Sequence, residues 1–563
     1  MMNRVLALVV VAILAGINIA GWWWFNRPVP VELSFNEPFP SVSFAPFRRG
    51  QGPITRVYPP PEQIKEDLQS LVGVARGIRT YTSLEGMHVV PPAAGKLGLE
   101  VTHSAWLGLE PEVNDKEVAA LIQAANQHPD AIKRVIVGNE VLLRQDLTAD
   151  QLIAHIRKVK AAVTQPVSYA DVWAFWLKNP QVAKEVDFIT IHILPYWEDE
   201  PIAVEHAAQH IVKIYRMMAE AFPGKPILIG EAGWPTYGRT RGPAVANMEN
   251  AARFVRTLAL VSKENGFDYN VVEAFDQPWK AKLEGTVGAK WGVVDEERRV
   301  KYAMSGPVEP SPRWPWHAAA STLLGVAATL IFLRRSDRFD ARAMVAVAVL
   351  AQICAAFAVW QVVYVRALAY DLGEDIWSAA RILAHGALAV LVVRAAAESF
   401  AKGATQAKAA LGQWLVALYG FCAISISVML LFNGRYRDIP PVEFLVPCVA
   451  VTLYALARMA LLRLDWKRAF AVGSLFGESY PGGVCPSGKI AAMLGLSVLA
   501  VPLSEAVALA RGEDFVVSHP KFADQFPLLV RALWENTEIV VWAAMVAVMI
   551  LPFLAQWLLE RER

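Results

Sequence analysis

The sequence predicts two folds in one chain: a (β/α)8 (TIM) barrel, followed by an all-α membrane domain with several spans. Between residues 39 and 302, short apolar runs alternate with polar segments of helical periodicity, which is typical of repeated βα units. From about residue 316 onward, long apolar runs alternate with short charged loops. A chain of 563 residues with 55% hydrophobic residues is too long for one core and unusually apolar for a soluble protein.

These composition changes divide the chain into four parts. The segment between barrel and membrane domain is rich in proline, so it continues neither a helix nor a strand ladder and is predicted to be a stiff linker. The expected parts are an N-terminal transmembrane anchor (1–31), a (β/α)8 barrel domain (32–304), the linker (305–315) and a membrane domain of about seven transmembrane helices (316–563).

The N-terminal apolar run could be a retained anchor or a cleaved signal peptide. Arg4 precedes an almost wholly apolar stretch, and Trp22, Trp23 and Trp24 follow it like an aromatic belt at a membrane interface. The small residues that a cleavage site needs are poorly matched there. The flanking residues therefore favour an anchor.

Eight candidate strands and five longer helices make up the predicted barrel. Its length is close to the roughly 250 residues typical of this fold, and Asp115 and Asp150 are expected to cap two of the helices. The expected strands are 41–45, 77–81, 99–106, 134–138, 166–170, 188–193, 226–230 and 270–275. The expected helices are 61–74, 115–127, 149–163, 203–222 and 248–265.

Seven further runs are long enough to cross a bilayer, which makes eight with the N-terminal helix. They lie at about 316–333, 343–365, 377–397, 410–432, 443–462, 489–510 and 538–559. With a cytoplasmic N-terminus, the positive-inside rule is obeyed and the barrel lies outside the cytoplasm. The inner loops then hold Arg334, Arg335, Arg338, Lys402, Lys408, Arg463, Lys467, Arg468, Arg561 and Arg563.

Composition argues against several other functions. The net charge of +2 comes without a basic cluster, so no nucleic-acid partner is expected. The barrel region has no cysteine, and His206 and His210, although spaced four apart, lack a third ligand, so no metal site is expected. No cofactor is expected either, and no nucleotide-binding motif is visible.

Two strands end on a glutamate. Val-Ile-Val-Gly-Asn-Glu ends the fourth strand on Glu140, and Ile-Leu-Ile-Gly-Glu ends the seventh on Glu231. A barrel presents catalytic groups at the C-terminal ends of its strands, and retaining cleavage of a glycosidic bond needs two carboxyl groups about 5 Å apart. Each glutamate alone could be a helix cap. Two of them, on strands four and seven, favour an acid/base and a nucleophile.

Six motifs spread over the whole barrel resemble glycoside hydrolase family 17, the β-1,3-glucanases and β-1,3-glucan transferases. They are Gly-Ile-Arg-Thr-Tyr (77–81), Val-Gly-Asn-Glu-Val (137–141), Ile-Leu-Pro-Tyr-Trp (193–197), Gly-Glu-Ala-Gly-Trp-Pro-Thr (230–236), Glu-Ala-Phe-Asp-Gln-Pro-Trp-Lys (273–280) and Trp-Gly-Val-Val-Asp (291–295).

The resemblance implies a role for each matching residue. Glu140 would be the general acid/base and Glu231 the nucleophile, while Asn139 would hydrogen-bond the sugar 2-hydroxyl. Tyr196 would orient Glu231, and Tyr81 would line the subsite of the cleaved sugar.

The substrate-binding set is completed by residues after the seventh and eighth strands. Trp234 and Trp279 lie inside the matched motifs and are expected to stack on sugar rings; Glu273, Asp276 and Lys280 stand nearby. Gln277 occupies a position that is acidic in plant members of the family. Bacterial membrane-bound relatives that act as glucan transferases are therefore the closer resemblance.

Together these features predict a β-1,3-glucan transglycosylase in a bacterial inner membrane, with its barrel on the periplasmic side. A covalent glucosyl-enzyme would be released by a sugar hydroxyl, giving elongation, β-1,6 branching or cyclisation. An endo-β-1,3-glucanase and a catalytically silent glucan-binding or export module are the alternatives. Expected partners are β-1,3-glucan, the lipid bilayer and a separate membrane glucan synthase.

Overall fold

The computed structural model describes residues 2–403, 407–477 and 486–562, so Arg563 lies outside the described residues. The chain divides into two compact units. The barrel unit comprises Pro28–Glu309 together with Gly512–Ser518, and the helical unit comprises the other described residues. The assignment of Gly512–Ser518 to the barrel unit was not expected, because this segment follows the barrel by about two hundred residues of apolar sequence.

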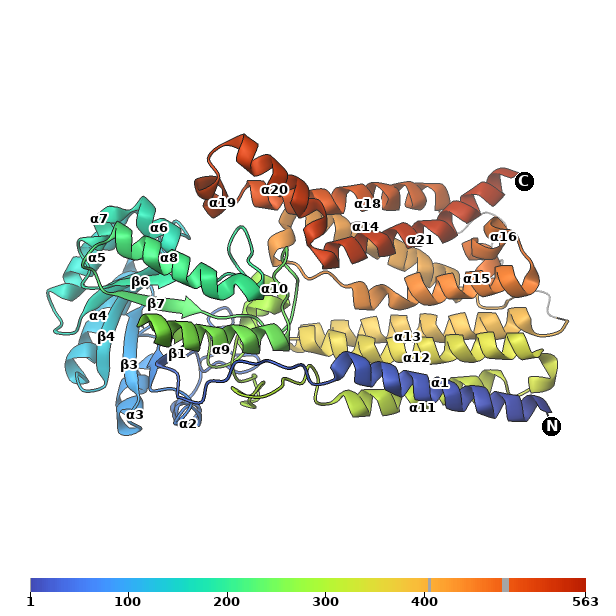
Figure 1. Cartoon of the computed structure of the whole chain (residues 1–563), viewed down its shortest axis with the longest axis horizontal. Coiled ribbons are helices and arrows are strands. Elements are labelled where there is room, and N and C mark those ends of the chain that lie inside the picture. Colours follow the sequence, from blue (N-terminus) through green and yellow to red (C-terminus); the bar gives the residue numbers. More distant parts are fainter. Residues whose placement is uncertain (1, 404–406, 478–485, 563) are drawn as a thin grey trace. The chain divides into compact units, whose positions relative to one another are not determined.

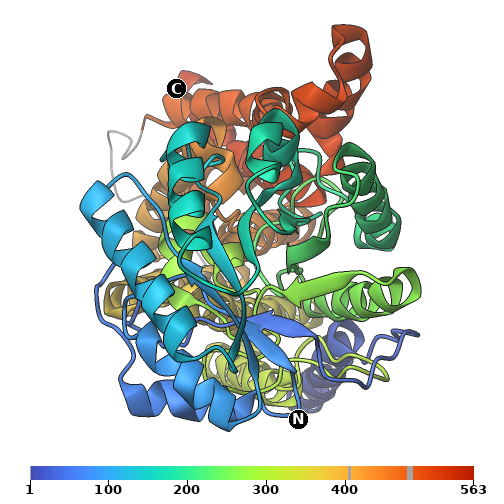
Figure 2. The same ribbon diagram turned by 90° about the vertical axis from the view of Figure 1, so that its left-hand side faces the viewer.

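Eight parallel strands close into a barrel in sequence order, which confirms the predicted fold class (Figures 1 and 2). They are β1 (Ser41–Ser43), β2 (Gly77–Arg79), β3 (Glu100–Ala105), β4 (Ile132–Asn139), β5 (Val167–Val172), β6 (Ile189–His192), β7 (Ile227–Ala232) and β8 (Asp268–Val271).

The last strand was predicted about two residues too late, at 270–275. Beyond Val271 the chain leaves the regular ladder: the Glu273 amide donates to the Trp291 carbonyl and the Ala274 amide to the Ser43 carbonyl. The apolar residues that suggested a longer strand, Val272, Ala274 and Phe275, are buried within this loop. Their burial gave the sequence an apolar run like that of a strand, although they lie outside the regular strand β8.

Helices surround the ring of strands (Figure 2). The barrel unit, all of whose residues are described, also contains three short 3₁₀ turns, at Met87–Val89, Val204–His206 and Pro278–Lys280. The helices of the barrel unit are α2 (Pro61–Ser70), α3 (Val90–Lys96), α4 (Pro111–Gln127), α5 (Ala149–Lys160), α6 (Trp173–Lys178), α7 (Pro180–Ala183), α8 (Ala207–Ala221), α9 (Met248–Asn265), α10 (Ala281–Gly288) and α19 (Glu513–Ser518).

Both predicted helix caps were wrong. Helix α4 begins at Pro111 rather than at Asp115, because the fixed φ of proline suits the first helical position. Helix α5 is capped by Thr148, whose side chain accepts from the Gln151 amide while the Gln151 side chain reaches back to the cap. This capping box satisfies two unpaired backbone donors at once, and it leaves Asp150 in the first turn.

The helical unit contains eight described helical segments long and apolar enough to cross a membrane. One of them is broken: Pro441–Leu462 begins as a 3₁₀ turn (Pro441–Phe444), continues as a π-helix (Val446–Ala450) and ends as α15 (Val451–Leu462). The others are α1 (Met2–Asn26), α11 (Trp314–Phe332), α12 (Ala341–Leu368), α13 (Leu372–Phe400), α14 (Leu411–Asn433), α18 (Ser487–Ala510) and α21 (Thr537–Glu562). Shorter helices are α16 (Trp466–Phe470), α17 (Val472–Phe476) and α20 (Phe522–Glu535).

Polar contacts join the apolar helices to one another. Asn18 and Trp22 of α1 both donate to the Ser321 hydroxyl of α11, at 2.8 Å and 3.0 Å. Arg381 of α13 pairs with Glu443 at 2.9 Å. Such contacts hold helices together where hydrophobic burial alone gives little driving force.

One buried arginine fastens both ends of the barrel. Arg256 of α9 has no exposed side-chain surface and donates to four carbonyls. Two of these, of Val31 and Leu33, precede β1, and two, of Ala303 and Gly306, follow the last barrel segment. The chain therefore leaves the barrel beside the point where it arrives.

Arg256→Met should lower the stability of the barrel unit by about 3 kcal/mol, because charged hydrogen bonds are lost and buried carbonyls stay unsatisfied. Pulse proteolysis of the full-length protein in urea measures this as a lower midpoint for the barrel. Lys263→Met on the same helix removes only an exposed pair with Glu37 and should leave the midpoint near that of the wild type. Equal midpoints for both variants would contradict the role of Arg256.

Candidate active site

Glu140 lies directly after β4 in a backbone conformation that side chains rarely adopt. Its φ is +53°, and two residues earlier Gly138 has a φ of +85°. A Cβ on Gly138 would lie 2.7 Å from Val141 Cγ2, so glycine is needed there. The Glu140 amide still donates to the Ala170 carbonyl of β5, at 2.8 Å. Non-glycine residues with positive φ concentrate at functional sites, where the surrounding structure holds them in place.

Glu231 stands near the end of β7, a strand that is buried along its whole length. A Cβ on the preceding Gly230 would lie 2.2 Å from Thr190 Cγ2 and 3.4 Å from Arg79 Nη1. The glycine therefore leaves room for the Thr190 side chain of β6. Arg79 of β2 lies beside the strand, where its Nη1 donates to the Gly230 carbonyl at 2.7 Å and to Glu231 Oε1 at 3.2 Å.

The structure brings the two predicted glutamates together. Carboxylate oxygens of Glu140 and Glu231 and a ring nitrogen of His192 all lie within 4.8 Å of one another. Retaining glycosidases place their two carboxyl groups about 5–5.5 Å apart, whereas inverting ones leave about 6.5–9.5 Å for a water molecule. The separation fits retention.

His192, the last residue of β6, bridges the pair. Its Nδ1 lies 2.8 Å from Glu140 Oε1, and its Nε2 lies 3.5 Å from Arg79 Nη1 and 3.6 Å from Glu231 Oε1. An imidazole protonated on Nδ1 donates to Glu140 and accepts from Arg79, which satisfies every group. Arg79 also donates to Asn139 Oδ1, so the residue expected to bind the sugar 2-hydroxyl belongs to the same network.

Sequence reasoning assigned no role to Arg79 or His192. Both are buried polar residues at the ends of otherwise apolar strands, β2 and β6. A polar residue at the C-terminal end of a barrel strand is the signal that could have found them.

The network lowers the pKa of Glu140. Burial raises the pKa, but the hydrogen bond from His192 and the charges of Arg144 and Arg79 outweigh it. The Glu140 carboxylate is therefore stabilised in its charged form. Neighbouring Asp171 of β5 behaves in the opposite way, because burial and then the charge of Glu140 raise its pKa to about 7.

Tyr81 and Glu273 lie on the Glu231 side of the site. Burial raises the pKa of the Tyr81 hydroxyl, and the charges of Glu231 and Glu273 add to this. Glu273 is fully buried; one oxygen accepts from Lys280 Nζ at 3.0 Å, while Oε2 has no partner among the described residues. Burial raises the pKa of Glu273 to about 7. An unpartnered buried oxygen beside the nucleophile suits a sugar hydroxyl.

Asp276 and Gln277 have partners within the protein. Asp276 Oδ1 accepts from Lys301 at 2.6 Å and from the Gly292 amide at 3.0 Å, so its carboxylate supports the loop after β8. Gln277 donates to the Ala45 carbonyl at 2.6 Å and accepts from Trp279 Nε1 at 3.0 Å. An amide does both at once, which an ionised acid cannot, so Gln277 fixes the partly buried Trp279 ring.

One aromatic expectation needs correction, and another stays a prediction. The Tyr196 hydroxyl donates to the Arg239 carbonyl in the loop after β7, and the role expected for Tyr196, to orient Glu231, stays a prediction. Trp234 is 1% exposed, and its Nε1 donates to the Val245 carbonyl at 2.9 Å. Its ring packs against Tyr196 and Phe254 and is closed to sugar stacking. Trp106 is 38% exposed, and the Arg144 guanidinium lies over its ring, 4.2 Å from the centroid.

Glu140, His192 and Glu231 are also close enough to hold one metal ion. Their contacts, however, are direct: His192 bonds Glu140, and Arg79 supplies a positive charge to Glu231. The Arg79 guanidinium thus already faces the Glu231 carboxylate, at 3.2 Å. Among the described residues, this group of three does not include His206 or His210. The His210 ring instead contacts the Glu198 carboxylate, at 2.7 Å.

A (β/α)8 barrel with two facing glutamates at the ends of β4 and β7 defines a glycoside hydrolase or transglycosylase. Residues 41–292 match the model of the BtgE/BtgC glycoside hydrolase domain. The barrel region is accordingly similar to a glycoside hydrolase domain, in agreement with the family 17 resemblance of its motifs.

Individual proteins are similar to part of the chain. A glucan 1,3-beta-glucosidase of Arthroderma benhamiae is 28% identical over 257 residues, which cover 42% of this chain and 82% of the relative. Another, of Schizosaccharomyces pombe, is 29% identical over 257 residues and 79% of its length. Among solved structures, a β-1,3-glucanosyltransferase of Rhizomucor miehei in complex with laminaritriose is 26% identical, with a TM-score of 0.42, over 47% of this chain and 95% of the neighbour.

His192→Leu should move the alkaline limb of the pH profile of kcat/KM to higher pH. The alkaline limb reports loss of the proton from the acid, Glu140, and the hydrogen bond from His192 lowers the pKa of that group. Removing the donor therefore lets Glu140 keep its proton to higher pH.

His192→Gln retains a donor and should restore part of the original profile. His206→Leu, a matched change at an exposed histidine, should leave the profile where it is. An unmoved alkaline limb in His192→Leu would show that His192 does not set the ionisation of Glu140.

Proposed function

We propose that the protein is a membrane-anchored retaining β-glucan transglycosylase. It cleaves β-1,3-glucan through a covalent glucosyl-enzyme and transfers the glycosyl group to a sugar hydroxyl, giving elongation, β-1,6 branching or cyclisation. The observation that carries this proposal is the close approach of the Glu140 and Glu231 carboxylates, within 4.8 Å. The names of the similar fungal glucosidases and of the glucanosyltransferase support the substrate class.

In the first step Glu231 attacks the anomeric carbon and forms an ester bond with it, while the bond to the leaving oxygen breaks. Glu140 gives its proton to that oxygen. Arg79 orients the Glu231 carboxylate, and it holds the Asn139 amide where the sugar 2-hydroxyl passes. His192 fixes the orientation of the Glu140 carboxylate.

In the second step an acceptor hydroxyl loses its proton to Glu140, and its oxygen attacks the anomeric carbon. The ester bond breaks, and Glu231 leaves as a carboxylate. The low pKa of Glu140 in the resting site shows that its environment stabilises the anion that serves as base. Water or a sugar can be the acceptor, so the outcome depends on which of them the site binds.

Two observations support a membrane location. Eight described helices are long and apolar enough to span a bilayer. Basic residues concentrate in the alternate loops expected on the cytoplasmic side, which agrees with a barrel on the periplasmic side of a bacterial inner membrane. A tethered enzyme cannot search for soluble glucan at a distance, whereas it can modify glucan emerging from a neighbouring membrane synthase. This favours transfer to a sugar over hydrolysis of soluble glucan.

Full-length protein in detergent, incubated with laminari-oligosaccharides, should yield products longer than the substrate, because a bound acceptor competes with water for the glucosyl-enzyme. Mass spectrometry of the products measures this. Glu231→Gln, which keeps the shape and removes the nucleophile, should abolish it. Products that are only shorter would favour a glucanase, as the names of the fungal relatives suggest; unchanged oligosaccharides would favour a glucan-binding module.

An engineered cysteine in the barrel should react with a membrane-impermeant maleimide in cells whose inner membrane is intact. Lys158→Cys is suitable, because Lys158 is exposed and the barrel region has no cysteine of its own. A cysteine in the loop between α11 and α12, at Asp337, should react only after the inner membrane is opened. The reverse pattern would place the barrel in the cytoplasm.

A further inference from the structure

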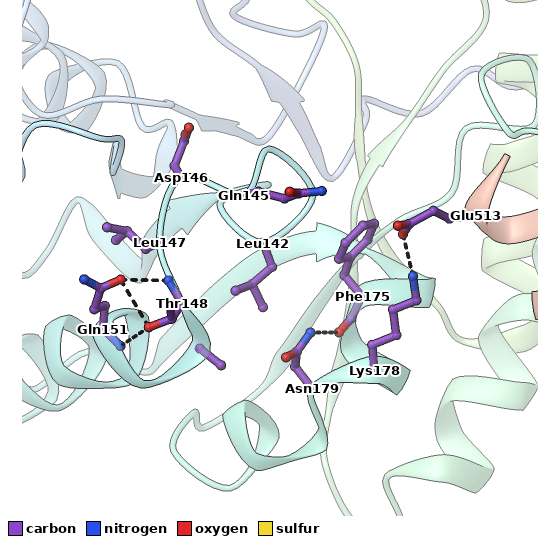
Figure 3. A pocket seen from close by; sticks show the side chains of 11 residues that line it. Leu142, Gln145, Asp146, Leu147, Thr148, Gln151, Phe175, Lys178, Asn179 and Glu513 are labelled. Atoms are coloured by element: carbon purple, nitrogen blue, oxygen red, sulfur yellow. Dashed lines mark hydrogen bonds and ion pairs between the residues drawn. The ribbon is translucent and has the colours of Figure 1, made fainter. Parts of the chain in front are cut away.

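A pocket of about 460 Å³ opens beside the segment that carries Glu140 (Figure 3). The loop between β4 and α5 forms one wall, through Leu142 and Gln145, and α6 forms another, through Phe175 and Lys178. Its volume is in the range of pockets that bind small ligands. None of the residues of the catalytic network lines it.

The remaining wall comes from Glu513, in the segment Gly512–Ser518 that belongs to the barrel unit. Glu513 pairs with Lys178 of α6, and the Asp514 amide donates to Asp199 Oδ2 at 2.9 Å. Phe515 is 1% exposed. A Cβ on Gly512 would lie 2.5 Å from Asp199 Cβ, so the backbone approaches the barrel closely. The segment is therefore a packed part of the pocket wall.

Hydrogen bonds lead from the inner wall of the pocket toward the catalytic centre. Leu142 follows Glu140 by two residues, which places their Cα atoms within about 7 Å. The Leu142 amide donates to the Tyr169 hydroxyl at 3.0 Å, and Tyr169 donates to Asp171, whose carboxyl group feels the charge of Glu140. The pocket thus adjoins the acid/base and not the nucleophile.

The position of the pocket on the Glu140 side of the site indicates which sugar it could bind. Glu140 gives its proton to the leaving sugar and later takes one from the acceptor, so both sugars occupy the Glu140 side of the scissile bond. The lining suits a glucan. Gln145 and Asn179 offer amides, Lys178 and Glu513 offer charged hydrogen-bonding groups, and Phe175 offers a ring.

We propose that this pocket is a binding site for the acceptor glucan chain, beyond the sugar that reacts, and that Gly512–Ser518 completes it. The proposal deepens the transglycosylase function and rests on it. Binding the distal part of a chain holds its reactive hydroxyl near the glucosyl-enzyme, which favours transfer over attack by water. Gly512–Ser518, which comes from the second half of the chain, thereby contributes to the choice of acceptor.

The test uses full-length protein and the pocket-filling variant Ala149→Phe. Ala149 lines the pocket at the start of α5. Ala154→Phe, on the exposed side of the same helix, is the matched control. The filled pocket should raise the KM for a long laminari-oligosaccharide acceptor about fivefold and lower the ratio of transfer to hydrolysis, while the control resembles the wild type.

A second measurement separates this proposal from the transglycosylase function. In a Glu231→Gln background, which binds without turnover, Ala149→Phe should weaken laminarihexaose about fivefold and leave laminaritriose unchanged. If the wild type makes no transfer products, the transferase function fails, and this loss of hexaose affinity alone still supports a glucan site. Equal hexaose affinity with and without Ala149→Phe overturns the pocket proposal, whatever the fate of the transfer activity.

Discussion

The site depends on one buried guanidinium at the end of β2. Arg79 reaches the Glu231 carboxylate, the Gly230 carbonyl, the Asn139 amide and the His192 ring from a single position. A buried cation of this kind is costly unless every contact is made, and breaking one partner leaves the others unsatisfied. The carboxylates of β4 and β7 would otherwise repel each other at this distance. Arg79 and His192 therefore let two acids share one small space.

The closed barrel supplies the geometry that this interaction needs. Parallel strands in sequence order put β4 and β7 on different sides of one mouth, and the register shifts between β4 and β5 and between β6 and β7 fall at the catalytic ends. Glu140, with its positive φ, sits just beyond the first of these irregularities. A third shift, between β7 and β8, also lies toward the mouth, whereas that between β3 and β4 lies near the start of the strands. Most of the irregular pairing therefore lies at the end of the barrel that carries the candidate site.

Much of this could be predicted from sequence. The apolar runs ending in Gly-Asn-Glu and Gly-Glu identified both glutamates, because strand periodicity and barrel topology determine where a strand end lies. What sequence could not provide was the partners. Tyr196 and Trp234 stand in the expected motifs, yet both donate to carbonyls of the loop after β7, Tyr196 to Arg239 and Trp234 to Val245. His192 looked like part of a buried strand, and Gly512–Ser518 looked like a loop between apolar helices; only packing reveals their contacts.

In the proposed mechanism a carboxylate oxygen of Glu231 forms the covalent bond to the sugar. Trapping this glycosyl-enzyme intermediate tests the mechanism most directly. A 2-deoxy-2-fluoro laminari-oligosaccharide donor with a good leaving group slows both steps but the release more. Peptide mass spectrometry of the full-length protein after this treatment should find the glycosyl group on the peptide containing Glu231. A label on Glu140 or Glu273, or continued turnover with no labelled peptide, would contradict the account.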